Sequence, residues 1–151
     1  MKPTERQAEC LEMMERLSLV DLTTIGKDGF PSTRAMLNLR NKREYPHLAA
    51  LYASEQNPLT VYLTTNTSSA KYSEIAQNPK ACLYYCEAHA FHGVLLQGTV
   101  EIVTDNELRR KAWMKGWEIY YPAGDCDYTL LRFVPDKLKI YSNFSVATET
   151  I

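Results

Sequence analysis

The sequence predicts a mainly β protein, built as a small antiparallel barrel with peripheral helices. About seven short runs of strand-forming residues follow one another along the chain, and most of the links between them are short turns. No regular alternation of strands and helices is sustained, which argues against a doubly wound parallel sheet. The 151 residues contain no internal repeat, low-complexity tract or linker, so we expect one domain over residues 1–151.

The first part of the chain predicts a helix followed by a hairpin. Apolar residues recur at helical spacing from Cys10 to Leu17, which indicates a helix that packs on the barrel, with Thr4 as its N-cap. Glycines and an aspartate then separate two runs of alternating polarity, which is typical of a β-hairpin. The elements expected here are a helix over 4–17, strands over 18–25 and 31–40, and a short helix over 47–54.

The second part predicts further strands with two helices between them. Asn78-Pro79 ends the first of these helices, and Thr104 with Glu107 forms a capping box that begins the second. Gly98, in the middle of a strand, indicates a bend or a close backbone approach. The expected elements are strands over 59–65, 81–86, 94–103, 128–134 and 138–142, helices over 69–77 and 104–117, an irregular segment over 120–127, a turn at Pro135-Asp136 and a tail over 143–151.

Composition excludes several classes of function. The formal net charge of −1 argues against nucleic-acid binding, and no run of about 18 apolar residues is present to span a membrane. The N-terminal segment is charged and amphipathic, unlike a secretory signal, so we expect a cytoplasmic protein whose four cysteines are free thiols. Sequence motifs of hydrolases and of P-loop proteins are missing.

The turn over residues 66–69 is the strongest candidate for a ligand site. This hydroxyl-rich turn leads directly into a helix that carries Lys71 in its first turn, and Arg34 lies upstream. Unpaired N–H groups and the positive end of the helix dipole favour an anion at such a position. From the local pattern alone, an alternative stays open in which Ser68 or Ser69 simply caps a surface helix and Lys71 is solvated.

Four potential metal ligands occur close together in Cys82, Cys86, His89 and His92. The two histidines fall in a predicted turn, and the spacing differs from that of usual structural zinc sites. We therefore favour a hairpin with buried thiols and expect no metal.

Two tryptophans, Trp113 and Trp117, are spaced by one helical turn, opposite the face of Leu108 and Ala112. Two apolar faces on one helix would require a second cover. The aromatic pair is compatible with core packing, with a subunit interface or with the wall of a planar-ligand site.

Four blocks together resemble one family, the FMN-binding split barrels related to pyridoxamine 5′-phosphate oxidase, and especially its small general-stress-protein branch. The resemblance covers most of residues 19–141, and the blocks occur in the family's order. They are Pro31-x-x-Arg34, TTNTSSAKYSEIAQNPKACLYY, VLLQGTVEIVTD and YPAGDCDYTLLRFVPDKLKIY.

The resemblance implies a six-stranded antiparallel split β-barrel that forms a homodimer, with FMN in clefts at the interface. Arg34 and Lys71 would bind the FMN phosphate with help from Ser69, and Gln97 would approach the flavin from the partner subunit. The Trp113 region would help to close the cleft. The full set of expected cofactor-binding residues is Arg34, Ala35, Met36, Thr64, Thr65, Ser68, Ser69, Lys71, Gln97 and Trp113.

The same resemblance implies a flavin-dependent oxidoreductase that acts on a small soluble substrate, although no catalytic side chain is identified. Pyridoxamine-phosphate oxidases are longer and carry an Arg-x-His substrate motif near the C-terminus. Here the corresponding stretch, LLRFVPDKLKIY, has no histidine, so vitamin B6 oxidation is not expected. The alternatives are a non-catalytic flavin carrier or redox sensor, and a cleft that holds a deazaflavin or haem.

Overall fold

Seven antiparallel strands and four α-helices make up the computed structural model, which describes residues 1–151. The strands are β1 (Leu19–Ile25), β2 (Pro31–Leu37), β3 (Val61–Asn66), β4 (Lys80–Glu87), β5 (His92–Val103), β6 (Tyr128–Ser142) and β7 (Ser145–Thr150). The α-helices are α1 (Glu5–Met14), α2 (Ala49–Ala53), α3 (Ala70–Gln77) and α4 (Asn106–Ala112). Short 3₁₀ turns are η1 (Pro46–Leu48), η2 (Ala88–Ala90), η3 (Trp117–Ile119) and η4 (Gly124–Cys126).

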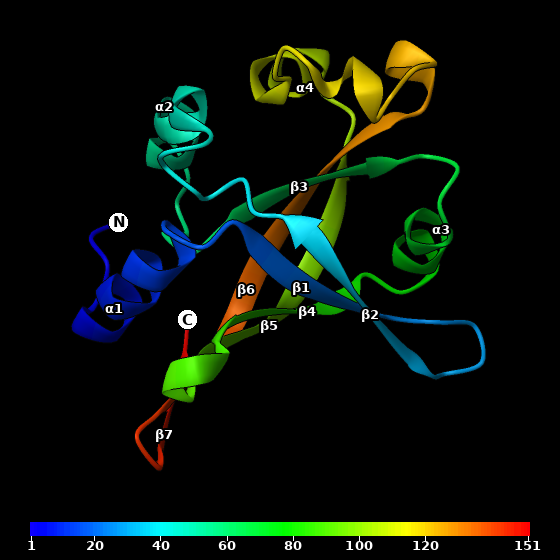
Figure 1. The fold of residues 1–151 in the computed structure, drawn as a ribbon. Coiled ribbons are helices and arrows are strands. Elements are labelled where there is room, and N and C mark those ends of the chain that lie inside the picture. The colour runs from blue at the N-terminus through cyan, green and yellow to red at the C-terminus, as the bar shows by residue number, and fades with distance from the viewer.

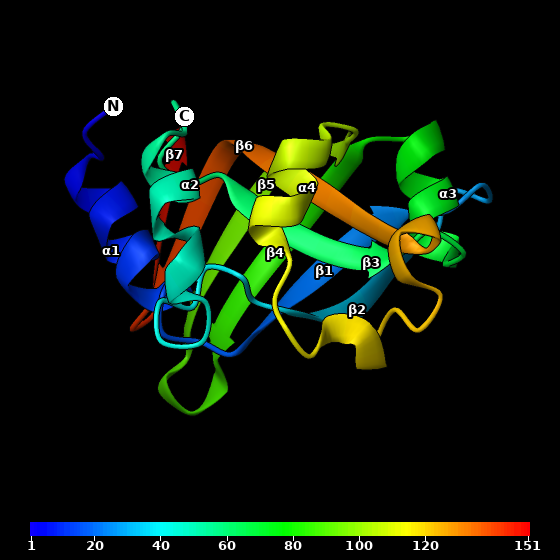
Figure 2. The same cartoon turned by 90° about the horizontal axis from the view of Figure 1, so that it is seen from above.

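Six strands form one curled sheet in the order β2-β1-β4-β5-β6-β3, and β7 pairs with β6 off this path. The predicted class, a split barrel that is mainly β with peripheral helices, is confirmed. Helices α1 and α2 lie at one end of the barrel, and α3 lies at the other end beside the tip of the β1–β2 hairpin (Figures 1 and 2). None of the helices has both the length and the apolar character needed to cross a bilayer.

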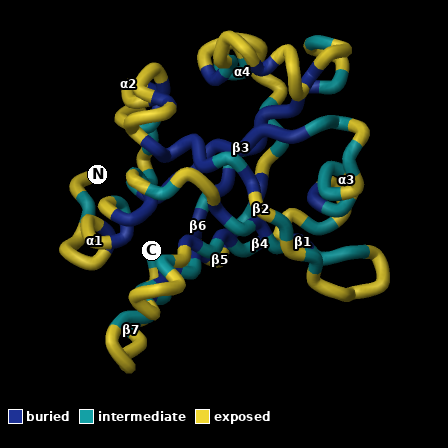
Figure 3. Tube along the Cα trace, viewed as in Figure 1, coloured by how far each residue is buried: buried dark blue, intermediate teal, exposed yellow.

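The core lies inside the curl of the sheet, where the buried stretches of β3 and β6 lie side by side (Figure 3). One row of paired residues shows how it is built: Leu22, Leu83 and Leu96 are register partners on β1, β4 and β5, and all three are fully buried. Burying a leucine side chain contributes about 1.5–3 kcal/mol, so such rows hold the curled sheet together. A second cluster, rich in aromatic residues, lies under α4, η1 and η3.

Strand β6 is continuous through Pro135 and Asp136, so the predicted turn between two separate strands is wrong. The register against β5 shifts between Gln97 and Gly98, and Asp136 is the extra residue of a β-bulge. The bulge changes the phase of β6, so that Phe133 and Leu138 both face the core. The predicted close approach at Gly98 is confirmed, because a Cβ there would lie 2.7 Å from the Cα of Pro135.

The segment expected to be a tail instead forms β7, which pairs with the end of β6. Its Glu149 accepts hydrogen bonds from Thr4 Oγ1 at 3.1 Å and from Gln7 Nε2 at 2.9 Å. Thr4 is also the N-cap of α1, as predicted, with Gln7 completing a capping box. The two ends of the chain are therefore tied together through α1 and β7.

Helix α4 is shorter than expected at both ends. Asp105, rather than Thr104, is its N-cap, and the carboxylate accepts hydrogen bonds from the backbone of Glu107 and Leu108. Aspartate is a better N-cap than threonine, because its negative charge also interacts favourably with the positive end of the helix dipole. The helix ends at Ala112, before both tryptophans.

Trp113 and Trp117 consequently do not form a second apolar face on a helix. Trp113 has an extended backbone, and Trp117 begins η3. Their rings lie 5.9 Å apart in the same aromatic cluster that receives Ala112 and Leu108. The predicted need for a second cover over α4 is therefore wrong, because the chain folds back on itself after Ala112.

The cysteines of β4 lie on the outer face of the sheet, in the predicted hairpin with β5. Cys82 is half-buried and Cys86 is exposed, so the expectation of buried thiols is wrong for this pair. Both alternate with Leu83 and Tyr85, which point into the core. Cys10, on α1, is the buried cysteine, and all four are free.

Candidate anion-binding site

The N-terminus of α3 follows β3 after a turn of only a few residues. Ser69 is the N-cap residue, but its side chain makes no capping hydrogen bond; its Oγ lies 3.2 Å from Thr65 Oγ1 instead. The alternative in which the Ser69 hydroxyl serves as the helix cap is therefore wrong. A helix start without a side-chain cap leaves backbone N–H groups for a ligand or water.

Arg34 reaches this site from β2. It lies in register with Leu22, and its side chain runs along the inward face of the hairpin, about a quarter exposed. Its Nη1 donates to Thr24 Oγ1 at 2.6 Å and to the carbonyl of Leu22 at 3.3 Å. Its Nη2 lies 3.4 Å from Glu74 Oε2. The guanidinium is thus fixed in position at the end of the barrel where α3 begins.

Lys71 lies in the first turn of α3 and is half-buried. Burial lowers the pKa of its ammonium, the nearby charge of Arg34 lowers it further, and Glu74 acts in the opposite direction. The charge of Arg34 thus disfavours the protonated form of Lys71. Two cations in this relationship favour binding of an anion, which would relieve the repulsion.

The turn before α3 is held by Asp127, which immediately precedes β6. Its Oδ1 accepts from the backbone N–H of Ser68 at 2.9 Å and its Oδ2 from Asn66 Nδ2 at 2.7 Å, while its carbonyl accepts from the N–H of Thr67 at 2.8 Å. The bonds from Ser68 and Asn66 hold the pKa of Asp127 below its ordinary value. The turn is therefore fixed by a residue far away in the sequence.

The other predicted site residues on β2 and β3 lie close to these groups in the chain but differ in exposure. Thr64, Thr65 and Met36 are buried, whereas Ala35 is exposed on the opposite face of β2, so only its backbone is placed to line a site beside Arg34. Ser68 is exposed, and its backbone is occupied by Asp127.

Gln97 does not join these residues within one chain. Its register partner on β4 is Cys82, which pairs in turn with Thr23 on β1. Residues paired in this way share a face, and that face is opposite to the one that carries Leu22 and Arg34. Gln97 is exposed there, in a shallow cleft of about 490 Å³ on the outside of the sheet.

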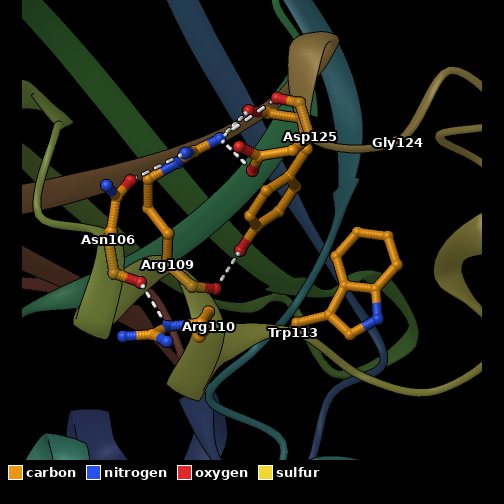
Figure 4. Close-up of a pocket in the computed structure, with 7 residues that line it drawn as sticks. Asn106, Arg109, Arg110, Trp113, Gly124 and Asp125 are labelled. Carbon is orange, nitrogen blue, oxygen red and sulfur yellow. Dashed lines mark hydrogen bonds and ion pairs between the residues drawn. The ribbon is translucent and has the colours of Figure 1, made fainter.

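Trp113 lines a separate cleft of about 560 Å³ between α4 and η4 (Figure 4). Arg109 crosses the cleft to Asp125 at 2.8 Å, and the ring of Tyr128 lies 5.1 Å from that of Trp113 in an edge-on arrangement. The hydroxyl of Tyr128 donates to the carbonyl of Arg109 at 3.0 Å. The guanidinium of Arg109 is therefore used in contacts within the protein, to Asp125 and to the carbonyl of Tyr128.

Sequence reasoning missed Thr24, Glu74 and Asp127. The position of Glu74 could have been predicted from the sequence, because it follows Lys71 by three residues and therefore lies on the same face of α3. The sequence contains no pattern that points to Thr24 or Asp127. Thr24 reaches the site through strand pairing, and Asp127 through hydrogen bonds to a turn that is distant in the sequence.

Comparison with known proteins agrees with this fold and this arrangement of motifs. The family described as Pyridoxamine 5'-phosphate oxidase matches residues 7–141, which is most of the chain. The chain belongs to the pyridoxamine 5'-phosphate oxidase family. No curated protein matches it significantly.

Solved structures of this family include close matches in fold. A Clostridium acetobutylicum protein related to general stress protein 26 of Bacillus subtilis is 32% identical, with a TM-score of 0.76, over 95% of this chain and 93% of that one. A pyridoxamine 5'-phosphate oxidase-related, FMN binding protein from Nostoc punctiforme is 14% identical, with a TM-score of 0.63, over 100% of this chain and 99% of that one.

The same fold also occurs in a protein with a different prosthetic group. A heme binding protein from Mycobacterium smegmatis is 14% identical, with a TM-score of 0.67, and the match covers 99% of this chain but 59% of that one. Identities this low show the shared fold alone, so membership of the family does not by itself define the ligand.

Proposed function

We propose that this protein binds FMN and that Arg34, Ser69 and Lys71 hold the cofactor's phosphate. The observation that carries the proposal is the position of Lys71 in the first turn of a helix whose N-cap makes no side-chain hydrogen bond, with Arg34 held against Glu74 of the same helix. A phosphate monoester is close to a dianion at neutral pH and is bound best by several charge-assisted donors. The family and its FMN-binding member from Nostoc punctiforme support this choice of ligand.

The residues around the site suit the rest of the cofactor. The backbone of buried Thr64 and Thr65, at the end of β3, would line the ribityl chain, and the backbone from Arg34 to Met36 would lie along the isoalloxazine ring. Ser68 and Ser69, in the turn held by Asp127, would lie at the phosphate end of the cofactor. The Trp113 region would close the cleft from the side of α4.

Gln97 would reach the flavin from a second copy of the chain. Within one protomer it lies on the sheet face opposite to that of Arg34, so it cannot line the same cleft. A homodimer in which the outer face of β5 packs near the partner's α3 would bring the two residues together. The site of one protomer is then complete only in the dimer.

Bound FMN would supply hydride or single-electron chemistry, and the protein would act as an oxidoreductase on a small soluble substrate in the cytoplasm. The chain's own residues would bind the phosphate, orient the ring and exclude water. No side chain of the site is an evident proton donor to a substrate, so the role of the protein is positioning.

Binding of FMN to the purified protein, followed by quenching of flavin fluorescence, tests the site. Arg34→Ala and Lys71→Ala should each weaken binding by about 1.5–3 kcal/mol, the value of a hydrogen bond to a charged group. Arg6→Ala is the matched control, because this exposed arginine lies on α1, at the opposite end of the barrel from α3 (Figure 2). Unchanged affinity in both site variants would disprove the assignment.

The visible spectrum of the freshly purified protein separates FMN from the other ligands of this fold. A flavin spectrum is expected, whereas a Soret band would identify haem, as the similarity to the haem-binding protein allows. A non-catalytic carrier or sensor is tested by adding reduced nicotinamide without oxygen, since an oxidoreductase should lose its flavin colour at a useful rate. Light scattering of the eluting protein measures the oligomeric state.

A further inference from the structure

Glu74 is built into the proposed phosphate site although its charge opposes an anion. It lies on α3, one turn after Lys71, and is largely buried. Its Oε2 accepts a hydrogen bond from Thr24 Oγ1 at 2.5 Å and lies 3.4 Å from Arg34 Nη2. Thr24, which is fully buried, accepts in turn from Arg34 Nη1 at 2.6 Å. The three side chains form a closed hydrogen-bonded ring.

This ring occupies one edge of the Arg34 guanidinium and leaves another free. Nη1 uses its N–H groups on Leu22 and Thr24, and Nη2 uses one on Glu74. The Nε–H and the remaining N–H of Nη2 have no partner in the protein. These two groups form the parallel fork that binds two phosphate oxygens at once. Thr24 and Glu74 thus orient Arg34 for a phosphate.

The charge of Glu74 has the opposite effect on affinity. The site contains two cations, Arg34 and Lys71, and the carboxylate of Glu74 beside Arg34 reduces the positive charge of this group. Because the carboxylate lies beside Arg34, it would repel a dianion bound to the same guanidinium. Its amide analogue could keep the bonds from Thr24 and Arg34 without this repulsion.

We propose that Glu74 sets the affinity of the phosphate site: it orients Arg34 together with Thr24, and its charge weakens binding so that the cofactor stays exchangeable. This inference rests on the proposed function, since it concerns the same phosphate. It assigns Glu74 and Thr24 as positioning residues, neither of which was expected from the sequence.

The experiment compares FMN with riboflavin, which lacks the phosphate, in the full-length wild-type protein and two variants. Glu74→Gln removes the charge and keeps the shape, so FMN should bind about tenfold more tightly and dissociate more slowly. Thr24→Val breaks the ring without changing charge, so FMN should bind more weakly. Riboflavin affinity should be the same in all three proteins.

Glu107→Gln, an equal charge change on the exposed face of α4, is the matched control and should leave FMN affinity unchanged. Weaker or unchanged FMN binding by Glu74→Gln would overturn the proposal, as would an equal gain for riboflavin. A failure of the proposed function gives a different result: FMN affinity would then be unaltered in Arg34→Ala and Lys71→Ala.

Discussion

Asp127 and Ser68 are joined across the end of the barrel by a 2.9 Å hydrogen bond from the backbone N–H of Ser68 to Asp127 Oδ1. The two residues are 59 positions apart, and the bond fixes the turn from which the proposed phosphate site begins. It also links that turn to the segment between η4 and β6. The geometry of the proposed site therefore depends on a carboxylate outside the set of residues proposed to bind FMN.

Asp127→Ala should weaken FMN binding severalfold, because the turn would lose the partners of both Ser68 and Asn66 and the helix start would be less well ordered. Flavin fluorescence titration measures the change. Asp125→Ala is the control, since this exposed neighbour pairs with Arg109 and not with the turn. Equal effects of the two substitutions would contradict a specific role for Asp127.

Binding of FMN should weaken as the pH rises. This loss should begin at a lower pH than the ordinary lysine pKa of 10.5 would predict. Burial and Arg34 lower the pKa of Lys71 from its usual 10.5, and a bound phosphate would raise it again. Affinity is then constant where Lys71 is protonated in both states and falls as the pH passes the lowered pKa of the free protein.

This pH dependence is measured by titrating FMN and riboflavin into the protein over the alkaline range. Both ligands contain the same flavin ring, so the ionisation of the ring cancels when the two affinities are compared at each pH. Lys71→Met should bind FMN weakly and abolish the pH-dependent difference. A difference that persists in Lys71→Met would show that another group is responsible.

Gly98→Ala should lower the free energy of unfolding by about 2–3 kcal/mol, as overpacking does in a close-packed interior. The added methyl group would overlap the carbonyl oxygen of Val134 and lie 2.7 Å from the Cα of Pro135, both of which are backbone atoms that cannot turn away. Urea denaturation measures the change.

Gly26→Ala is the matched glycine substitution for this test. Its methyl group would meet the side-chain oxygen of Asp28 at 3.0 Å and the Phe30 carbonyl at 3.5 Å, in the exposed tip of the β1–β2 hairpin. We expect a smaller loss than at Gly98. A larger loss at Gly26 would contradict the importance of the β5–β6 approach.

Glu55→Gln should lower the free energy of unfolding by about 2 kcal/mol at neutral pH. Burial opposes the ionisation of Glu55, but hydrogen bonds from Arg132 and Tyr62 outweigh it, so the net effect is a lowered pKa. The Arg132 Nε bond to Oε1 measures 3.0 Å. Glu101→Gln is the control, because its bond to Arg132 is exposed and worth at most about 1 kcal/mol.

The same carboxylate gives a pH test with a defined sign. Because the folded pKa of Glu55 is lower than its ordinary 4.5, its contribution is fully present above 4.5 and is lost as the pH falls through the folded pKa. Wild type and Glu55→Gln should therefore converge in stability as the pH falls below 4.5 and through the folded pKa of Glu55. Parallel acid profiles for the two proteins would exclude this role.

Much of the fold could be predicted because its signals are local. The N-cap at Thr4, the hairpin glycines before β2 and the hydroxyl-rich turn before α3 each act within a few residues. The error at Pro135-Asp136 came from a long-range contact. The two residues have the composition of a turn, yet the pairing of β6 with β5 continues through them and makes Asp136 the extra residue of a bulge.

The sequence by itself determined the class of fold, the family and the residues able to hold an anion, since residue type, spacing and turn chemistry are properties of the chain. The tertiary structure decided which of these residues meet. Strand register placed Arg34 beside Thr24 and Glu74, and Gln97 on the opposite face. The turn held by Asp127 fixed the position of Ser68. Such relationships depend on contacts between distant segments, and these form only when the sheet closes.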